Sequence, residues 1–257
     1  MDSLTISVVS HGQAGIVRDL LADIAALVHK PARVVLTVNI PEDLGFDEKT
    51  FPLAIDFVHN KAPRGFGSNH NAAFALCRTP FFCILNPDIR LPDDPFPELI
   101  DVLESDRTTG LVAPLVVNPA GGIESTSRRF PTPAIILHKA LFGPPKAPDY
   151  PIGTEPVFPD WVGGMFMLLR SETFTRISGF DERYFLYYED VDLCARLRCL
   201  GLEICLDPRS RAVHEARRDS HRRPRHFIWH VRSMLRFWMS RPYAELRAGA
   251  PKRASAP

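Results

Sequence analysis

The strongest chemical pattern in this sequence is a group of carboxylates that follows a run of aromatic residues. Glu189, Asp190 and Asp192 come directly after the aromatic stretch 184–188. Apolar neighbours raise the pKa of a carboxyl group, and such a group can then act as a general base. Acids at a helix start also suit the helix dipole, and Asp192 can pair with Arg196. The cluster therefore predicts either a catalytic base or a charged helix start.

A second group of polar residues follows the apolar run 81–85. It consists of Asn86, Pro87 and Asp88. Ligands of open α/β sheets bind beyond the carboxyl ends of the strands, so Asp88 is a candidate carboxylate for a metal or phosphate site. The same tripeptide is also typical of a plain turn. His214 is a second candidate metal ligand, and a surface histidine is the alternative.

Glycines mark further positions where the backbone could approach a ligand. Gly163 and Gly164 follow Trp161, and the segment 179–182 begins with a glycine that predicts a tight turn. A glycine-containing loop spans 64–68. Each of these features alone is weak evidence for a binding site.

The elements that would carry these residues alternate between strands and helices. Apolar patterns predict strands at 4–10, 33–40, 55–59, 81–85, 110–117, 161–169 and 202–206. Helical patterns predict helices at 14–29, 71–77, 95–104, 171–177, 190–200 and 226–240. The Pro- and Gly-rich stretch 118–159 predicts a loop or hairpin excursion, and His214 follows the last predicted strand. This alternation predicts an α/β domain with a mostly parallel sheet.

The charges are distributed unevenly along the chain. Formal net charge is +1, yet thirteen basic and three acidic residues lie between Arg209 and Arg253. The predicted helix 226–240 places an apolar, aromatic face beside an arginine face, which is typical of an interfacial helix. The same helix could equally pack on the domain or on a second subunit. Nucleic-acid-binding motifs are absent from the sequence, so we expect no nucleic-acid partner.

The cysteines and the N-terminus bear on the cellular compartment. Five cysteines without a C-x-x-C pair favour neither a disulfide framework nor a zinc site, and they suit a reducing cytosol. The N-terminus lacks a basic region before its apolar stretch, and no apolar run reaches the ~18 residues of a membrane helix. We expect a cytoplasmic protein that is neither exported nor membrane-spanning.

In their order along the chain, these motifs resemble inverting glycosyltransferase family two, particularly its bacterial rhamnosyltransferase-like branch. The resemblance covers roughly residues 4–240 and rests on Thr5–Ser10, Gly65–Asn71, Asn86–Asp88, Gly163–Gly164 with Gly179–Asp181, and Tyr188–Leu193. It implies a GT-A fold, a mostly parallel central sheet flanked by helices. We expect a catalytic domain at 1–215, with a nucleotide-sugar half at 1–117 and an acceptor half at 118–215. A basic amphipathic helical tail at 216–247 and a disordered end at 248–257 would follow.

The resemblance assigns the donor nucleotide to the loops after the first strands. The end of the first strand would line the nucleotide pocket, and the loop after the third strand would pack around the base and diphosphate. The family usually places an acid at the end of the second strand, and here that acid is displaced to Glu42. The donor-binding residues implied are Val9, Ser10, His11, Asn39, Glu42, Gly65, Gly67, Asn71, Asn86 and Asp88.

The resemblance also implies a metal ion and a catalytic base. Asn86-Pro-Asp88 corresponds to the family's Asp-x-Asp, whose acids hold a divalent ion at the leaving diphosphate, and the last acid alone is kept here. Asp88, assisted by His214, would hold Mn²⁺ or Mg²⁺. Asp190 would remove the proton of the acceptor hydroxyl, with Glu189 as the alternative base. The acceptor side would be bordered by Trp161, Gly163 and Gly164.

The expected function is transfer of L-rhamnose from dTDP-L-rhamnose to a saccharide or lipid-linked saccharide in bacterial surface polysaccharide synthesis. A UDP-hexose-dependent transferase is one alternative. A non-catalytic nucleotide-sugar-binding protein is another, because the first acid is replaced by Asn86. A lipid-linked acceptor would place the protein at the inner membrane face, with 222–240 touching anionic lipid, whereas a homodimer would cover this segment instead. A Rossmann dehydrogenase is disfavoured, because the loop 65–70 lacks the third glycine of G-x-G-x-x-G and does not follow the first strand.

Overall fold

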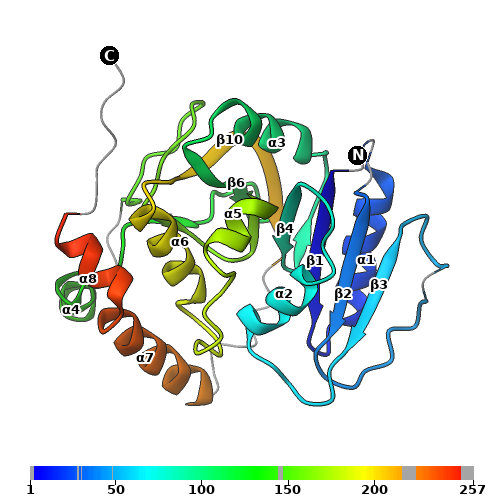
Figure 1. Cartoon of the computed structure of the whole chain (residues 1–257), viewed down its shortest axis with the longest axis horizontal. Helices are drawn as coiled ribbons and strands as arrows, with labels where there is room; N and C mark the ends of the chain where they lie inside the picture. Colours follow the sequence, from blue (N-terminus) through cyan, green and yellow to red (C-terminus); the bar gives the residue numbers. More distant parts are fainter. Residues whose placement is uncertain are drawn as a thin grey trace.

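A computed structural model of the chain shows a large central sheet with helices on both faces (Figure 1). The structure describes residues 3–27, 29, 31–47, 49–143, 147–215 and 224–249. The strands are β1 (Leu4–Ser10), β2 (Arg33–Val38), β3 (Ile55–His59), β4 (Phe81–Leu85), β5 (Ile89–Arg90), β6 (Thr109–Val117), β7 (Ser127–Arg128), β8 (Trp161–Val162), β9 (Phe166–Arg170) and β10 (Glu203–His214). The helices are α1 (Ala14–Ala26), α2 (Phe66–Phe74), α3 (Phe96–Ser105), α4 (Pro133–Phe142), α5 (Ser171–Arg176), α6 (Glu189–Cys199), α7 (Pro224–Trp238) and α8 (Arg241–Arg247).

The main sheet has eight strands in the order β3-β2-β1-β4-β9-β6-β10-β5. The first four strands in this order are parallel to one another, and β6 runs parallel to β10. β9 is antiparallel to both of its neighbours, β4 and β6, and β5 is antiparallel to β10. The predicted mostly parallel α/β sheet is therefore confirmed, with β9 inserted between its two parallel groups.

The two faces of the sheet bury alternate residues of the same strands. Cys83 and Leu85 of β4 join the core cluster that contains the apolar face of α1. Phe82 and Ile84 join the cluster that contains residues of α5 and α6. Successive side chains of a strand point to opposite faces, so a strand that is apolar throughout must be covered on both sides. The predicted strand at 81–85 is confirmed, and its apolar residues are covered on both faces.

Three predictions of element bounds around the site are wrong, and the predicted helix 14–29 and strand 33–40 end earlier, at 26 and 38. The stretch 161–169 is divided into β8 and β9, because β8 pairs with β7 while β9 pairs inside the main sheet. β10 extends to His214 instead of ending at 206, because it continues along β6 and then pairs with β5. His214 is therefore the last residue of this strand. α2 begins at Phe66, before the predicted start at 71, and its first turn uses the glycine-containing loop.

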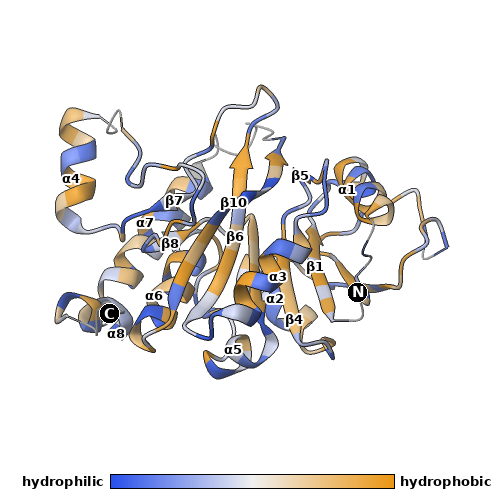
Figure 2. Ribbon diagram, turned by 90° about the horizontal axis from the view of Figure 1, so that it is seen from above, coloured by the Kyte–Doolittle hydropathy of each residue, from blue (hydrophilic) through white to orange (hydrophobic). Residues whose placement is uncertain are grey.

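The segment 118–159 contains more structure than the predicted loop. β7 lies in it, and so does α4, which begins after Thr132. The hydroxyl of Thr132 accepts a hydrogen bond from the N–H of Ile135 (3.2 Å), which caps the helix start. In the described part of the chain α4 buries none of its side chains, and Figure 2 shows it standing out from the body of the molecule.

The C-terminal region folds into two helices where one was predicted. α7 corresponds to the predicted helix 226–240, and α8 follows after Ser240, whose hydroxyl accepts from the N–H of Tyr243 (3.3 Å). Phe237 of α7 and Tyr243 of α8 pack with Tyr184 and Tyr188 in a third core cluster. None of the described helices is long and apolar enough to cross a membrane. The predicted disordered end at 248–257 lies outside the described residues from 250 onward, as does 216–223 of the tail.

Candidate functional site

The two predicted catalytic acids stand at the start of α6. Asp190 is held by the backbone: its Oδ2 accepts from the N–H of Gly164 (3.0 Å), and its Oδ1 accepts from the N–H of Val191 (2.8 Å). Glu189 is buried, and its Oε2 lacks a hydrogen-bond partner among the residues that the structure describes. The two neighbouring carboxyl groups therefore have very different surroundings.

These surroundings shift the two pKa values unequally. Burial raises the pKa of Glu189 well above its usual range, and the charge of Asp190 raises it further. Burial also raises the pKa of Asp190, but the N–H groups of Val191 and Gly164 oppose this by stabilising its ionised form. The two backbone hydrogen bonds therefore favour the ionised form of Asp190, whereas burial favours the neutral form of Glu189.

The backbone turn before the acid pair is strained. Tyr187 and Tyr188 have φ values of 69° and 67°, in the left-handed region. This conformation costs a residue with a Cβ about 1–2 kcal/mol, so surrounding contacts have to maintain it. Tyr188 is the N-cap of α6, and its conformation therefore sets the direction in which Glu189 and Asp190 leave the turn.

α7 supplies contacts to every residue of this segment, 185–188. The Ser233 hydroxyl donates to the carbonyl of Leu186 (3.0 Å), and the Tyr187 hydroxyl lies 3.0 Å from Nδ1 of His226. Aromatic contacts add to these, with ring centroids 4.8 Å apart for Phe185 and Trp229, 5.3 Å for Tyr188 and His230, and 5.9 Å for Tyr188 and Phe237. One face of α7 therefore holds the turn that leads to the acid pair.

The predicted metal ligands meet at the other end of the site. His214 lies between two carboxylates: its Nε2 is 3.2 Å from Oδ2 of Asp88, and its Nδ1 is 2.7 Å from Oε2 of Glu124. The Asp88 carboxylate and, more weakly, that of Glu124 raise the pKa of His214 to about 9 despite its partial burial. The second oxygen of Asp88, Oδ1, is buried without a partner among the described residues.

A short link joins the acid pair to Asn86 and Asp88. The carbonyl of Met165 accepts from the N–H of Asn86 (2.9 Å), while the preceding Gly164 donates to Asp190. A Cβ on Gly164 would lie 3.5 Å from the Cβ of Asp190 and 3.3 Å from the ring of Phe66, so this backbone approaches closely on both sides. Two consecutive residues between β8 and β9 therefore connect the two predicted catalytic motifs.

The remaining residues of the predicted acceptor side contact the segment before α4. The Trp161 indole N–H donates to the carbonyl of Arg129 (2.9 Å). The N–H of Gly163 donates to the carbonyl of Thr126 (2.9 Å). Both residues are half-buried, so part of their surface stays open beside Gly164.

The predicted nucleotide residues at the first two strands are joined by hydrogen bonds. Asn39 is buried, donates to the carbonyl of Arg64 (3.0 Å), and lies 3.1 Å from Nδ1 of the exposed His11. Glu42 accepts from the N–H groups of Gly12 and Ala14 (3.1 Å each) at the start of α1. Val9 and Ser10 end β1, which lies parallel and adjacent to β4, so their carboxyl end adjoins Asn86. These side chains fix the loops around the strand ends.

The predicted loop residues Gly65, Gly67 and Asn71 fasten α2 to the segment before the acid pair. The Asn71 amide accepts from the N–H of Phe180 (2.8 Å) and donates to its carbonyl (2.9 Å). A Cβ on Gly65 would lie 2.7 Å from the carbonyl oxygen of Phe185. In the structure these residues therefore make close contacts between α2 and the segment 180–185.

We expect the substitution Gly67→Ala to lower the free energy of unfolding by about 1–3 kcal/mol, because the new Cβ would lie 2.6 Å from the Cβ of Phe180. The gain in helix propensity of about 1 kcal/mol does not offset such an overlap. Urea denaturation measures the difference. Gly153→Ala is the matched control, since its Cβ would meet no atom within 4 Å and should change stability by at most about 0.5 kcal/mol. Equal losses of unfolding free energy in the two variants would contradict the predicted overlap at Gly67.

Curated relatives place this arrangement in a family. The chain is 30% identical over 243 residues to rhamnosyltransferase WbbL of Escherichia coli (strain K12), and the match covers 90% of this chain and 91% of the relative. The chain belongs to the rhamnosyltransferase-like branch of glycosyltransferase family two. It is also 24% identical over 273 residues to an N-acetylglucosaminyl-diphospho-decaprenol L-rhamnosyltransferase of Mycobacterium tuberculosis (strain ATCC 25618 / H37Rv), covering 93% of this chain and 85% of that protein. No family model matches the sequence.

Solved structures confirm the GT-A fold of this glycosyltransferase. GalNAc-T7 with UDP, GalNAc and Mn²⁺ superposes with a TM-score of 0.65 at 15% identity, over 88% of this chain and 46% of that one. The mannosyltransferase PcManGT of Pyrobaculum calidifontis with GDP-Man and Mn²⁺ gives a TM-score of 0.62 at 16% identity, over 91% of this chain and 64% of that one. The chain therefore spans about half to two thirds of these structural neighbours.

Two sets of residues around this glycosyltransferase site were not predicted from the sequence. Glu124 lies in the stretch expected to be a loop, and no motif marks it as a partner of His214. His226, Ser233 and Phe237 belong to the predicted amphipathic helix, but its periodicity does not reveal that they hold the turn 185–188. Both sets depend on contacts between segments distant in sequence.

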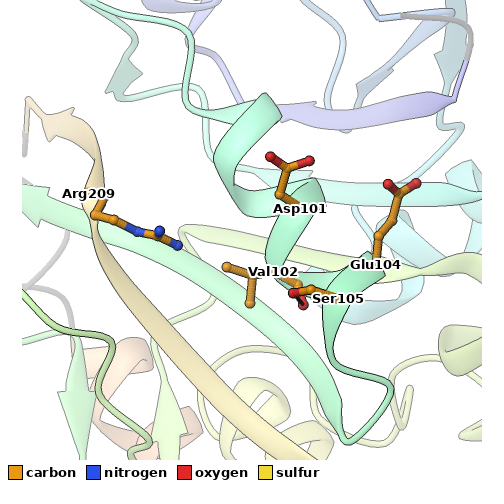
Figure 3. A pocket seen from close by; sticks show the side chains of 5 residues that line it. All are labelled: Asp101, Val102, Glu104, Ser105 and Arg209. Carbon is orange, nitrogen blue, oxygen red and sulfur yellow. Dashed lines mark hydrogen bonds between the residues drawn. The ribbon is translucent and has the colours of Figure 1, made fainter.

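A separate surface cavity of about 570 Å³ lies between α3 and β10 (Figure 3). Its lining residues are Asp101, Val102, Glu104, Ser105 and Arg209. None of the predicted site residues of the glycosyltransferase lines it. The guanidinium of Arg209 is already bound by Asp207 (2.6 Å), so we assign this cavity no part in the reaction.

Proposed function

We propose that this glycosyltransferase moves L-rhamnose from dTDP-L-rhamnose to a hydroxyl of a saccharide or lipid-linked saccharide, with inversion at the anomeric carbon. The observation that carries the proposal is the link through Gly164 and Met165, which ties a backbone-held carboxylate to the Asn86–Asp88 motif. The names of the two rhamnosyltransferase relatives support the sugar, and the decaprenol-linked substrate in one of these names supports a lipid-linked acceptor.

Asp190 is the proposed base. It would accept the proton of the acceptor hydroxyl while that oxygen bonds to the anomeric carbon. The bond from this carbon to the diphosphate oxygen would break, and dTDP would leave with the electron pair. The N–H groups of Gly164 and Val191 orient the carboxylate and favour its ionised form, and burial favours the neutral form of Glu189, which adds no competing charge. A positioned general base contributes about 10²–10⁴-fold to the rate.

Asp88 and His214 are the proposed ligands of a divalent ion such as Mn²⁺. Their chemistry fits, because the buried Oδ1 of Asp88 has no described partner, and the imidazole nitrogen beside the second oxygen can bind a cation when it releases its proton. Among the described residues no three His, Cys, Asp or Glu side chains form a complete metal-binding group, so donor phosphates would complete the coordination. The bound ion would neutralise the developing charge of the leaving diphosphate.

The proposal is tested by thermal unfolding with dTDP, dTDP-L-rhamnose, UDP and UDP-hexoses, each with and without Mn²⁺. Specific binding raises the melting temperature, so we expect the largest metal-dependent increase with the two dTDP compounds. A selective increase with UDP compounds would replace the rhamnosyl donor by a hexosyl one. If no nucleotide raised the melting temperature, both the proposed reaction and the non-catalytic nucleotide-sugar-binding alternative would be contradicted, whereas binding without release of dTDP would favour that alternative.

A further inference from the structure

α7 carries two stripes of residues on opposite sides. The inner stripe, which holds the turn before the acid pair, contains His226, His230, Ser233 and Phe237. The outer stripe lies two positions further along the chain and contains Ile228, Arg232 and Leu235, with Met239 directly after the end of the helix. Two positions correspond to about 200° around a helix, so the second stripe faces away from the protein. Its apolar members are 55%, 45% and 80% exposed.

α4 presents a second apolar surface that the described residues leave exposed. Leu137, Leu141 and Phe142 are 60%, 66% and 74% exposed, although the helix has only ten residues. An isolated helix of this length gains little stability in water, and most helices are stabilised by packing an apolar face. A surface with several large apolar side chains exposed on neighbouring helices points to a partner.

The two helices adjoin at one corner of the molecule. The indole N–H of Trp238, the last residue of α7, donates to the carbonyl of Pro131 (2.8 Å), two residues before α4 begins. The rings of Phe237 and Phe130 lie 6.2 Å apart. Figure 1 shows α7 along the lower edge, with α4 close to its C-terminal end.

The positive charges on these helices favour an anionic partner. α4 and α7 contain no Asp or Glu, and their formally charged residues are Lys139, Arg225, Arg232 and Arg236. Exposed apolar side chains interspersed with Lys and Arg are the composition of helices that lie in the interface of an anionic membrane. A symmetric dimer through the same face would instead bring the cations of two copies together.

We propose that α4 and the outer stripe of α7 form a docking surface for an anionic lipid bilayer. This proposal deepens the proposed function. Its connection to a lipid-linked acceptor rests on that function, whereas docking itself requires no sugar transfer. The inner stripe of α7 holds the turn that leads to Asp190, so docking would place the base on the protein side of α7, at least one helix diameter (about 10 Å) from the lipid surface. A hydroxyl on a lipid-linked saccharide lies at such a surface.

The test is co-sedimentation of the full chain with vesicles of phosphatidylcholine alone or with phosphatidylglycerol added. We expect binding to the phosphatidylglycerol vesicles, weakened by high salt because surface charges are screened. Leu235→Glu and Leu141→Glu should each lower the apparent affinity about tenfold or more, because a carboxylate replaces an inserting side chain. Leu76→Glu, which changes a leucine that is 37% exposed on the turn after α2, should bind as the wild type does.

Thermal unfolding with dTDP separates the two proposals. An unchanged nucleotide response in Leu235→Glu, with lost vesicle binding, supports docking as a distinct property of this face. The docking proposal is overturned if wild type does not sediment with anionic vesicles, or if the glutamate variants bind as well as wild type. It is also overturned if light scattering shows a dimer that these variants dissociate, since a second copy would then cover the face.

Discussion

Replacing Asp190 by asparagine is expected to lower the turnover number about 10²- to 10⁴-fold while leaving nucleotide binding intact, because the amide cannot accept the acceptor's proton. Asparagine keeps the shape of the side chain, and its oxygen can still accept one of the two backbone hydrogen bonds. Release of dTDP measures turnover, and thermal unfolding with dTDP measures binding. Equal activity of wild type and Asp190→Asn would remove Asp190 as the base.

Glu189→Gln is the matched control for this experiment. Glutamine resembles the protonated form in which burial and the charge of Asp190 hold Glu189, so we expect a much smaller loss than in Asp190→Asn. The opposite ranking would make Glu189 the base. Wild-type activity should also fall as the pH falls toward the raised pKa of Asp190, since protonation removes the base.

Replacing Asp88 by asparagine is expected to lower turnover about 10²-fold or more and to abolish the effect of Mn²⁺ on dTDP binding, because a metal ion contributes several kcal/mol of charge stabilisation. The substitution removes the one carboxylate of the Asn86–Asp88 motif, so the turn after β4 keeps no negative charge for a cation. Titration of Mn²⁺ in the dTDP-release assay and in thermal unfolding measures both effects.

Glu124→Gln provides a graded comparison. Glu124 contacts Nδ1 of His214, the nitrogen that faces away from Asp88. Substitution of a residue that supports a metal ligand in this manner typically lowers metal affinity or activity about 10–100-fold. We expect its effect to be smaller than that of Asp88→Asn. Asp101→Asn, in the separate cavity, should leave turnover unchanged. A Mn²⁺ response that survives in Asp88→Asn would contradict the assignment of the metal site.

Local sequence patterns predicted the parts of this fold that local forces determine. The strands at 4–10, 55–59 and 81–85 have the predicted bounds, because each is a short run of strand-forming residues between turns. The predicted strand 161–169 was wrong because its two parts pair with different partners. Periodicity along one segment contains no information about such pairing.

The candidate site was predictable to the same degree. The acid pair and the Asn86–Asp88 motif occupy strand and helix ends, which patterns can locate. The different surroundings of Glu189 and Asp190 could not be predicted, since they depend on the N–H of Gly164 and on the burial of Glu189. The contact of His214 with Glu124 spans 90 positions and leaves no local pattern.

The position of α7 late in the chain affects the order in which parts of the protein fold during synthesis. The contacts that hold Leu186 and Tyr187 come from residues 47 and 39 positions later. When β10 has emerged from the ribosome, the nascent chain contains every strand of the sheet. The left-handed turn at 187–188 still lacks these partners at that stage, because α7 has not yet been synthesised. Since strain of this kind persists only while contacts maintain it, the acid pair reaches its final orientation after the sheet is complete.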